Sequence, residues 1–175
     1  MHYVRKRRKE FNELINEVHG GELMISDDTL QTISHIFCGD IEDFFSYKSG
    51  PKLVSFFNEY FNRNDRYGQG FPSRWAYVYD KLVGILSSGA FDSFLNLILS
   101  KEYLMRDCGL LQVQATERAQ VIFDELNRIV QKDLYVITHT NGKYHLCAEN
   151  ADLVLIGSGG FANVYRQKST GRILK

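Results

Sequence analysis

Residues 115–147, ATERAQVIFDELNRIVQKDLYVITHTNGKYHLC, contain the change of pattern that decides the fold. Over 115–131 the apolar residues recur at the spacing of one helix face; they are Ala119, Ile122, Phe123, Leu126, Ile129 and Val130. Residues 134–138 are instead mostly β-branched or aromatic, and the Asn141-Gly142 pair after them is the strongest short signal for a β-hairpin. The stretch therefore predicts a helix followed by a hairpin at 133–147, as at the end of a winged-helix module or as a cap on a helical bundle.

The preceding residues predict further helices, so the expected fold class is mainly α, with a helical N-terminal domain over 1–149. Helical spacing of apolar residues places these helices at 4–18, after a Ser26 cap, at about 40–47, at 52–61, after Ser73, and from Phe91 toward Leu104. Residues 62–72 are polar and glycine-rich and predict a loop. We expect the aromatic residues on these helices to fill a core rather than to stack bases or bind a partner groove; they include Phe44, Phe45, Phe56, Phe57 and Phe61.

Composition limits the function classes. The chain has 21 basic and 21 acidic residues, so nothing in its net charge attracts nucleic acid or acidic membranes. A basic run at 5–9 leaves nucleic-acid binding open as a minor alternative to a solvated face. No apolar run is long enough to cross a bilayer, and the N-terminus does not resemble a signal peptide. Three widely spaced cysteines, Cys38, Cys108 and Cys147, predict buried thiols in a reducing compartment, so we expect a cytoplasmic protein without membrane association.

Residues 152–175, DLVLIGSGGFANVYRQKSTGRILK, form a second unit with a different pattern. An apolar run ending at Ile156 predicts a strand, and Gly157-Ser158-Gly159-Gly160 follows it directly. Alternation through Val164, a turn near 169–171 and a new apolar run before Lys175 predict two more strands. Glycines between two strands let backbone N–H groups approach phosphate oxygens without a side chain in the way.

This segment resembles the glycine-rich loop of protein kinases, G-x-G-x-x-G-x-V. Gly157 and Gly159 match its first two glycines, Phe161 its loop-tip aromatic residue and Val164 its valine, whereas Ala162 replaces the third glycine. The resemblance implies that Ile156, Gly157, Ser158, Gly159, Gly160, Phe161 and Val164 cover ATP. It also implies that Lys175 is the lysine that contacts the α- and β-phosphates. Two alternatives stay open: a Rossmann dinucleotide fingerprint, which requires a helix directly after the glycines, and a plain glycine turn.

The kinase resemblance covers only about 150–175, which would be the truncated start of an ATP-binding lobe. The chain contains no catalytic-loop H-R-D and no D-F-G, so we assign no catalytic or metal-binding residue. The chain ends within an apolar strand, and we expect it to be an N-terminal fragment of a Ser/Thr protein kinase that acts on a protein substrate with ATP and magnesium, inactive alone.

The first 150 residues resemble the helical modules that precede effector domains in bacterial anti-phage abortive-infection proteins. The resemblance lies in GFPSRWAYVYDKL at 70–82 and NGKYHL at 141–146. It implies a regulatory or sensor role for the helical domain. The alternative from another class is a non-catalytic sensor or adaptor whose helical domain binds a protein or nucleic-acid partner.

Overall fold

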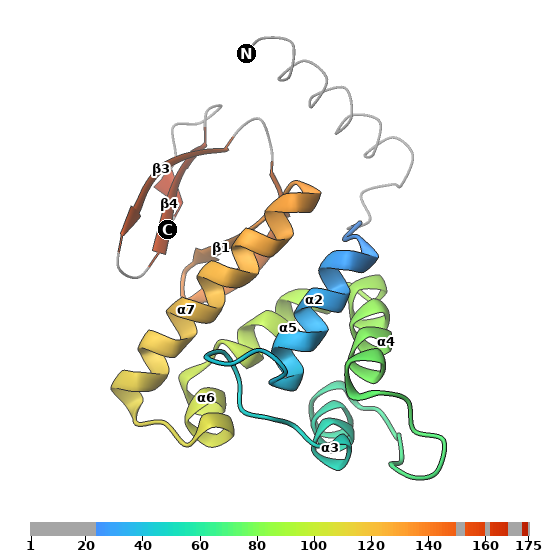
Figure 1. Ribbon diagram of the computed structural model, residues 1–175. Helices are drawn as coiled ribbons and strands as arrows, with labels where there is room; N and C mark the ends of the chain where they lie inside the picture. Colours follow the sequence, from blue (N-terminus) through green and yellow to red (C-terminus); the bar gives the residue numbers. More distant parts are fainter. Residues whose placement is uncertain (1–23, 150–152, 160–161, 168–172, 175) are drawn as a thin grey trace.

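The computed structural model describes residues 24–149 in full and the backbone of 153–159, 162–167 and 173–174. The structure is mainly helical and the helices lead into a two-stranded hairpin, which confirms the predicted fold class (Figure 1). The predicted helix at 4–18 and the basic run at 5–9 lie outside the described residues. The helices are α2 (Asp27–Cys38), α3 (Gly50–Phe61), α4 (Arg74–Ser87), α5 (Phe91–Ile98), α6 (Lys101–Cys108) and α7 (Gln112–Val130). A short 3-10 turn, Gln131–Asp133, leads to β1 (Tyr135–Thr140) and β2 (Lys143–Ala148).

Helix α2 lies between α7 and α4 and contributes the centre of the core (Figure 1). Phe37 of this helix is 0% exposed, and its ring lies 4.8–6.2 Å, centroid to centroid, from four other phenylalanine rings. These are Phe45, Phe56, Phe57 and Phe94. Phe44 and Phe61 are partly buried against the same core. The aromatic residues therefore fill the core, as the helical spacing predicted.

The predicted helix at about 40–47 is wrong, because residues 39–49 form a crossing segment of turns and bends between α2 and α3. Gly39 ends α2 with a φ of 73° and Asp43 has a φ of 74°, and neither value continues an α-helix. A Cβ on Gly39 would lie 2.5 Å from the Ser46 carbonyl oxygen, so the chain folds back directly over the helix end. Phe45 is nevertheless 5% exposed, which explains why the spacing of apolar residues resembled a helix face.

The helix predicted from Phe91 toward Leu104 is two helices. Helix α5 ends at Ile98, and Ser100 is the N-cap of α6, where its hydroxyl accepts a hydrogen bond of 3.2 Å from the Tyr103 N–H. A serine side chain that caps a new helix replaces the continued backbone ladder. The break changes the direction of the chain and lets α6 present its own face to α3.

The β1–β2 hairpin has the predicted turn. Asn141 and Gly142 have φ values of 53° and 74°, the left-handed pair that a two-residue hairpin turn requires, and the register runs from Tyr135 opposite Ala148 to Thr140 opposite Lys143. Side chains of the helices form hydrogen bonds to each outer edge of this hairpin. The Asn127 amide bonds to the N–H and C=O of Ile137, at 2.7 and 3.0 Å. Asn96 bonds in the same way to Tyr144, at 2.9 and 2.7 Å. These bonds explain how a two-stranded sheet persists on a helical domain.

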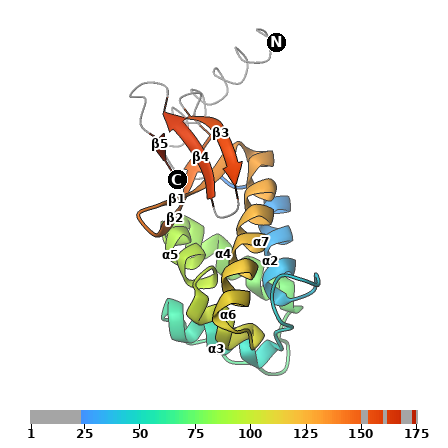
Figure 2. The same cartoon turned by 90° about the vertical axis from the view of Figure 1, so that its left-hand side faces the viewer.

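A second sheet, of order β3-β4-β5, follows the hairpin. Its strands are β3 (Leu153–Gly159), β4 (Ala162–Gln167) and β5 (Ile173–Leu174), and both pairings are antiparallel. Strands β4 and β5 both contact β1, and Figure 2 shows the second sheet beside the hairpin.

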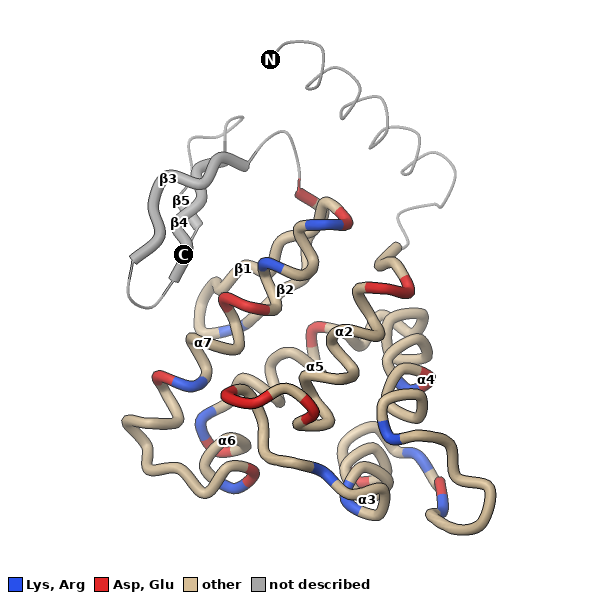
Figure 3. Tube along the Cα trace, in the orientation of Figure 1, with Lys and Arg blue, Asp and Glu red and all other residues tan. Residues whose placement is uncertain are grey.

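Charges of both signs occur on α3, α4, α6 and α7, whereas α2 and α5 carry acidic residues but no Lys or Arg (Figure 3). Helix α6, for example, carries Lys101, Glu102, Arg106 and Asp107. Within the described residues no helix presents the uninterrupted basic stripe that a nucleic-acid-binding face requires. A search of the same residues found no helix whose length and hydropathy would let it cross a membrane.

Candidate functional site

The predicted glycine-rich site lies on strands β3 and β4. Gly157 pairs with Val164, Ser158 with Asn163, and Gly159 with Ala162. The register shifts between Leu155 and Gly157, so Ile156 lies at a bulge directly before the first glycine. Two residues separate the last paired positions, Gly159 and Ala162, and these are Gly160 and Phe161.

Three predicted site residues, Gly160, Phe161 and Lys175, lie outside the described residues. Lys175 follows β5 directly in the sequence, and Leu174 of that strand pairs with Tyr165 of β4. Strand β4 occupies Ala162–Gln167, the place where a Rossmann fingerprint requires a helix. The backbone of the segment therefore has the strand, glycine, strand, strand order that the pattern of residues predicted, and it differs from the order required by the dinucleotide alternative.

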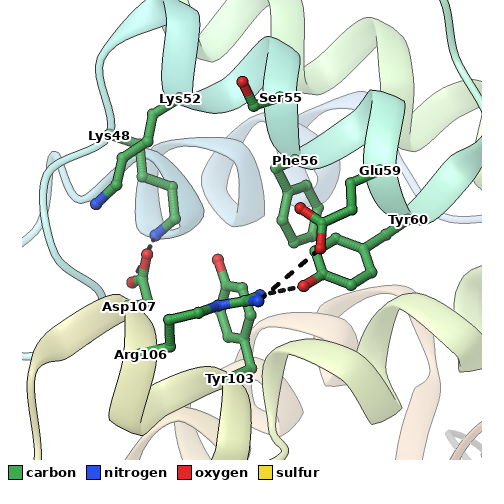
Figure 4. A pocket seen from close by; sticks show the side chains of 9 residues that line it. All are labelled: Lys48, Lys52, Ser55, Phe56, Glu59, Tyr60, Tyr103, Arg106 and Asp107. Atoms are coloured by element: carbon green, nitrogen blue, oxygen red, sulfur yellow. Dashed lines mark hydrogen bonds and ion pairs between the residues drawn. The ribbon is translucent and has the colours of Figure 1, made fainter.

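A pocket that the sequence analysis missed lies between α3 and α6, with a volume of about 280 Å³ (Figure 4). Helix α3 contributes a face of residues spaced three and four apart, and α6 contributes a second face with the same spacing. The crossing segment adds Lys48 at the base. The lining residues are Lys48, Lys52, Ser55, Phe56, Glu59, Tyr60, Tyr103, Arg106 and Asp107.

A buried ion pair forms the base of this pocket. The Lys48 ammonium lies 2.9 Å from an Asp107 carboxylate oxygen, and the two side chains are only 2% and 5% exposed. The ammonium also donates to the Ser46 carbonyl at 3.3 Å and lies over the rings of Phe37 and Phe45, 4.6 and 4.7 Å from their centroids. Burial lowers the pKa of Lys48, and Asp107 opposes this shift. Because the Lys48 ammonium already contacts a carboxylate, a carbonyl and two aromatic rings, Lys48 is a structural residue of the pocket base.

The other polar groups of the pocket have fewer interaction partners within the protein. Arg106 donates a hydrogen bond to the Tyr60 hydroxyl and lies 3.9 Å from a Glu59 carboxylate oxygen, with both charged side chains 60% exposed. Tyr103 is 5% exposed, and Figure 4 shows its hydroxyl directed into the pocket. Within residues 24–149 this hydroxyl has no hydrogen-bond partner, and the Lys52 ammonium has neither a hydrogen bond nor an ion pair. Burial and the Asp107 charge raise the pKa of Tyr103, so its hydroxyl remains a donor at neutral pH.

A second hollow, of about 380 Å³, lies under the 62–72 loop, and its one carboxylate already has partners. The Asp65 carboxylate accepts a hydrogen bond of 2.8 Å from the Tyr77 hydroxyl and lies 3.0 Å from the Lys81 ammonium. The amide of Asn58 bonds to the Asp65 backbone on both sides, at 2.9 and 3.0 Å. Asp65 therefore closes the loop onto α3 and α4 and serves a structural role.

A histidine–carboxylate pair near the hairpin is structural for the same reason. The His145 Nδ1 lies 2.9 Å from one Asp92 oxygen, while the other oxygen accepts from the Leu146 N–H at 2.8 Å.

The three cysteines are free thiols, and burial raises the pKa of each, to about 12 for Cys38. A raised pKa disfavours the thiolate that nucleophilic catalysis requires. Among the described residues no group of three His, Cys, Asp or Glu side chains is placed to hold a metal ion.

The sequence did carry a signal for the α3–α6 pocket. Lys52, Ser55 and Glu59 recur at helical spacing on α3, as do Tyr103 and Arg106 on α6. The signal is incomplete, because spacing places residues on a face without saying which other helix that face meets. The break at Ser100, which creates α6, was also not predicted. Comparison of the chain with models of known protein families, with curated proteins and with solved structures found no match.

Proposed function

We propose that residues 150–175 are the phosphate-covering start of a protein-kinase-like ATP-binding lobe, and that the helical domain before them regulates it. The observation that carries this proposal is the antiparallel β3–β4 pairing. Gly157 and Gly159 belong to the last three pairs of this hairpin, and two residues connect the strands beyond Gly159. Without a Cβ at these positions, ATP phosphates can approach the backbone N–H groups closely. The register also supports the role of Val164 as an adenine cover, because it lies opposite Gly157.

In this proposal the chain supplies binding and orientation, and further polypeptide supplies the chemistry. Lys175, next to β5, would hold the α- and β-phosphates. The magnesium ligands and the base that accepts the proton of a protein hydroxyl would come from residues outside these 175, because no H-R-D or D-F-G occurs here. The parent protein would transfer the γ-phosphoryl group of ATP to a serine or threonine of a protein substrate in the cytoplasm. A role in anti-phage defence is the extension of this proposal that the helical domain suggests.

The test uses the full-length gene product that contains this chain. ATP with magnesium should raise its melting temperature, and Gly159→Val should abolish the shift because the valine side chain occupies the space of a phosphate oxygen. NAD should give no shift. The control is Gly68→Ala, at a site where a Cβ meets no atom within 4 Å. The 175-residue chain alone should incorporate no label from radiolabelled ATP.

Two results would overturn the proposal. A shift from NAD alone, lost in Gly159→Val, would assign the glycines to a dinucleotide-binding fold. No shift from either nucleotide would leave a plain glycine turn, and the protein would then be a non-catalytic sensor or adaptor.

A further inference from the structure

The α3–α6 pocket has an uncompensated positive charge. Lys48 and Asp107 neutralise each other at 2.9 Å, in a nearly fully buried pair. Arg106 and Glu59 are 3.9 Å apart and 60% exposed, so they attract each other weakly in water. Lys52 remains, without an ion pair or hydrogen bond to any residue of 24–149. The pocket therefore favours an anion.

The hydroxyl of Tyr103 points to the same kind of ligand. The Tyr103 side chain is mostly buried, but its hydroxyl lines the pocket and has no hydrogen-bond partner in the part of the chain that the structure describes in full. It is therefore available to donate a hydrogen bond to a ligand in the pocket. Figure 4 shows this hydroxyl between the Lys48–Asp107 pair and the Arg106 guanidinium, and Lys52 on the far side of Lys48 at the edge of the pocket. The hydroxyl is thus a donor without an acceptor beside the Arg106 guanidinium.

We propose that this pocket binds a small phosphate monoester, with Tyr103, Arg106 and Lys52 as donors to the phosphate oxygens. A phosphate offers three terminal oxygens to three separate donors, whereas a carboxylate offers only two. The volume of about 280 Å³ lies at the lower end of small-molecule sites, so the ligand is no larger than about a mononucleotide. The rings of Phe56 and Tyr60 line the pocket and provide an apolar surface for the rest of the ligand. The site belongs to the helical domain and does not depend on the glycine-rich strands.

Isothermal titration calorimetry on the full 175-residue chain tests this assignment with inorganic phosphate, adenosine 5′-monophosphate, adenosine and benzoate. Phosphate and the monophosphate should bind, whereas adenosine and benzoate should not. Tyr103→Phe removes only the hydroxyl oxygen and should weaken monophosphate binding roughly 10-fold or more, the usual loss for a hydrogen bond to a charged group. Lys52→Gln should have a similar effect. The matched control, Lys101→Gln, removes an exposed charge of α6 that lies outside the pocket and should bind as the unmodified chain does.

The glycine-rich strands could also attract phosphate, so Gly159→Val is the second control. It should leave binding unchanged, which separates this site from the proposed ATP-binding lobe. Loss of binding in Gly159→Val would move the ligand to those strands and overturn the assignment. Absence of binding, equal binding of benzoate, or unaltered binding by both Tyr103→Phe and Lys52→Gln would overturn it as well. Circular dichroism of each variant checks that the helices are retained.

Discussion

The crossing segment at 39–49 and the β1–β2 hairpin each depend on a glycine with almost the same backbone angle. The φ is 73° at Gly39 and 74° at Gly142, but the surroundings are opposite. A Cβ on Gly39 would lie 2.5–2.7 Å from backbone atoms of Ser46 and Tyr47, whereas a Cβ on Gly142 would meet nothing within 4 Å. One glycine is required by conformation and packing together, the other by conformation alone. The comparison separates these two costs within one chain.

Side chains of the helices hold both regions through backbone atoms, but with different chemistry. At the crossing segment Arg74 donates to the carbonyl of Cys38, the last residue of α2, at 3.1 Å and to that of Lys48 at 2.9 Å, and Arg118 donates to that of Phe44, at 3.1 Å. An irregular segment leaves carbonyls unpaired, and guanidinium groups can satisfy several of them. In the hairpin Asn127 and Asn96 each satisfy one N–H and one C=O of the same residue. At a strand edge the N–H and the C=O of one residue point the same way, and the oxygen and nitrogen of a side-chain amide can bond to both.

The largest expected effect comes from Gly39→Ala. A left-handed φ destabilises a non-glycine residue by roughly 1–2 kcal/mol, and forcing a methyl group into a filled space adds about 1–3 kcal/mol. Because the obstructing atoms are backbone, they cannot rotate away, and we expect a loss of about 4 kcal/mol in the free energy of unfolding. Urea denaturation followed by circular dichroism measures it. A loss no larger than that of Gly142→Ala would show that packing over Gly39 contributes nothing.

Asn127→Leu should have the next largest effect. Asn127 is 2% exposed, and its loss leaves the buried N–H and C=O of Ile137 without partners. Each unsatisfied group destabilises the fold by roughly 1–3 kcal/mol, so we expect about 3 kcal/mol. Asn96→Leu is the matched variant on the other edge and should lose less, because water can reach its partly buried site. Equal losses in the same denaturation measurement would contradict the role of burial.

The sequence predicted the hairpin but not the crossing segment, for a physical reason that these contacts illustrate. The Asn141-Gly142 turn is a local preference, since each residue adopts its φ without help from distant parts of the chain. The crossing depends on Arg74 and Arg118, which lie far along the sequence and reach it only in the folded chain. The α3–α6 pocket depends on the fold in the same way. The spacing of residues along the sequence indicates a face on each helix, but it does not predict that these two faces pack against each other. The strand order of 153–174 was predicted because glycines and alternation are local signals.

A thiol in or next to each region allows a third comparison, in which the free energy of unfolding is measured as a function of pH. Burial raises the pKa of Cys38, next to the crossing segment, to about 12 from an ordinary value of 9.0, and it also raises the pKa of Cys147 in β2. A folded-state pKa above the unfolded value contributes stability that is complete below pH 9 and is lost as the pH rises toward 12. For Cys38 the loss should be about 1.4 kcal/mol per pH unit in that window.

Cys38→Ala should therefore flatten the decline of stability between pH 9 and 11, and Cys147→Ala should flatten it less. Urea denaturation at pH 8, 9, 10 and 11 gives the slopes. The contributions of Lys48 and of the tyrosines are common to all three proteins and cancel when the slopes are compared. An identical slope in Cys38→Ala and the unmodified chain would show that Cys38 ionises as an exposed thiol does.

The smallest effect should come from Gly142→Ala, which isolates the conformational cost. Nothing lies within 4 Å of the added methyl group, so only the φ of 74° opposes the alanine, and we expect a loss of about 1 kcal/mol in unfolding free energy. Gly68→Ala is the control, because its site is equally open and its φ is not in the left-handed region, and it should change stability by less than about 0.5 kcal/mol. Subtracting the Gly142→Ala loss from that of Gly39→Ala then gives the packing contribution over Gly39 directly. If Gly142→Ala costs no more than Gly68→Ala, the turn tolerates alanine, and the whole loss at Gly39 belongs to the backbone that covers it.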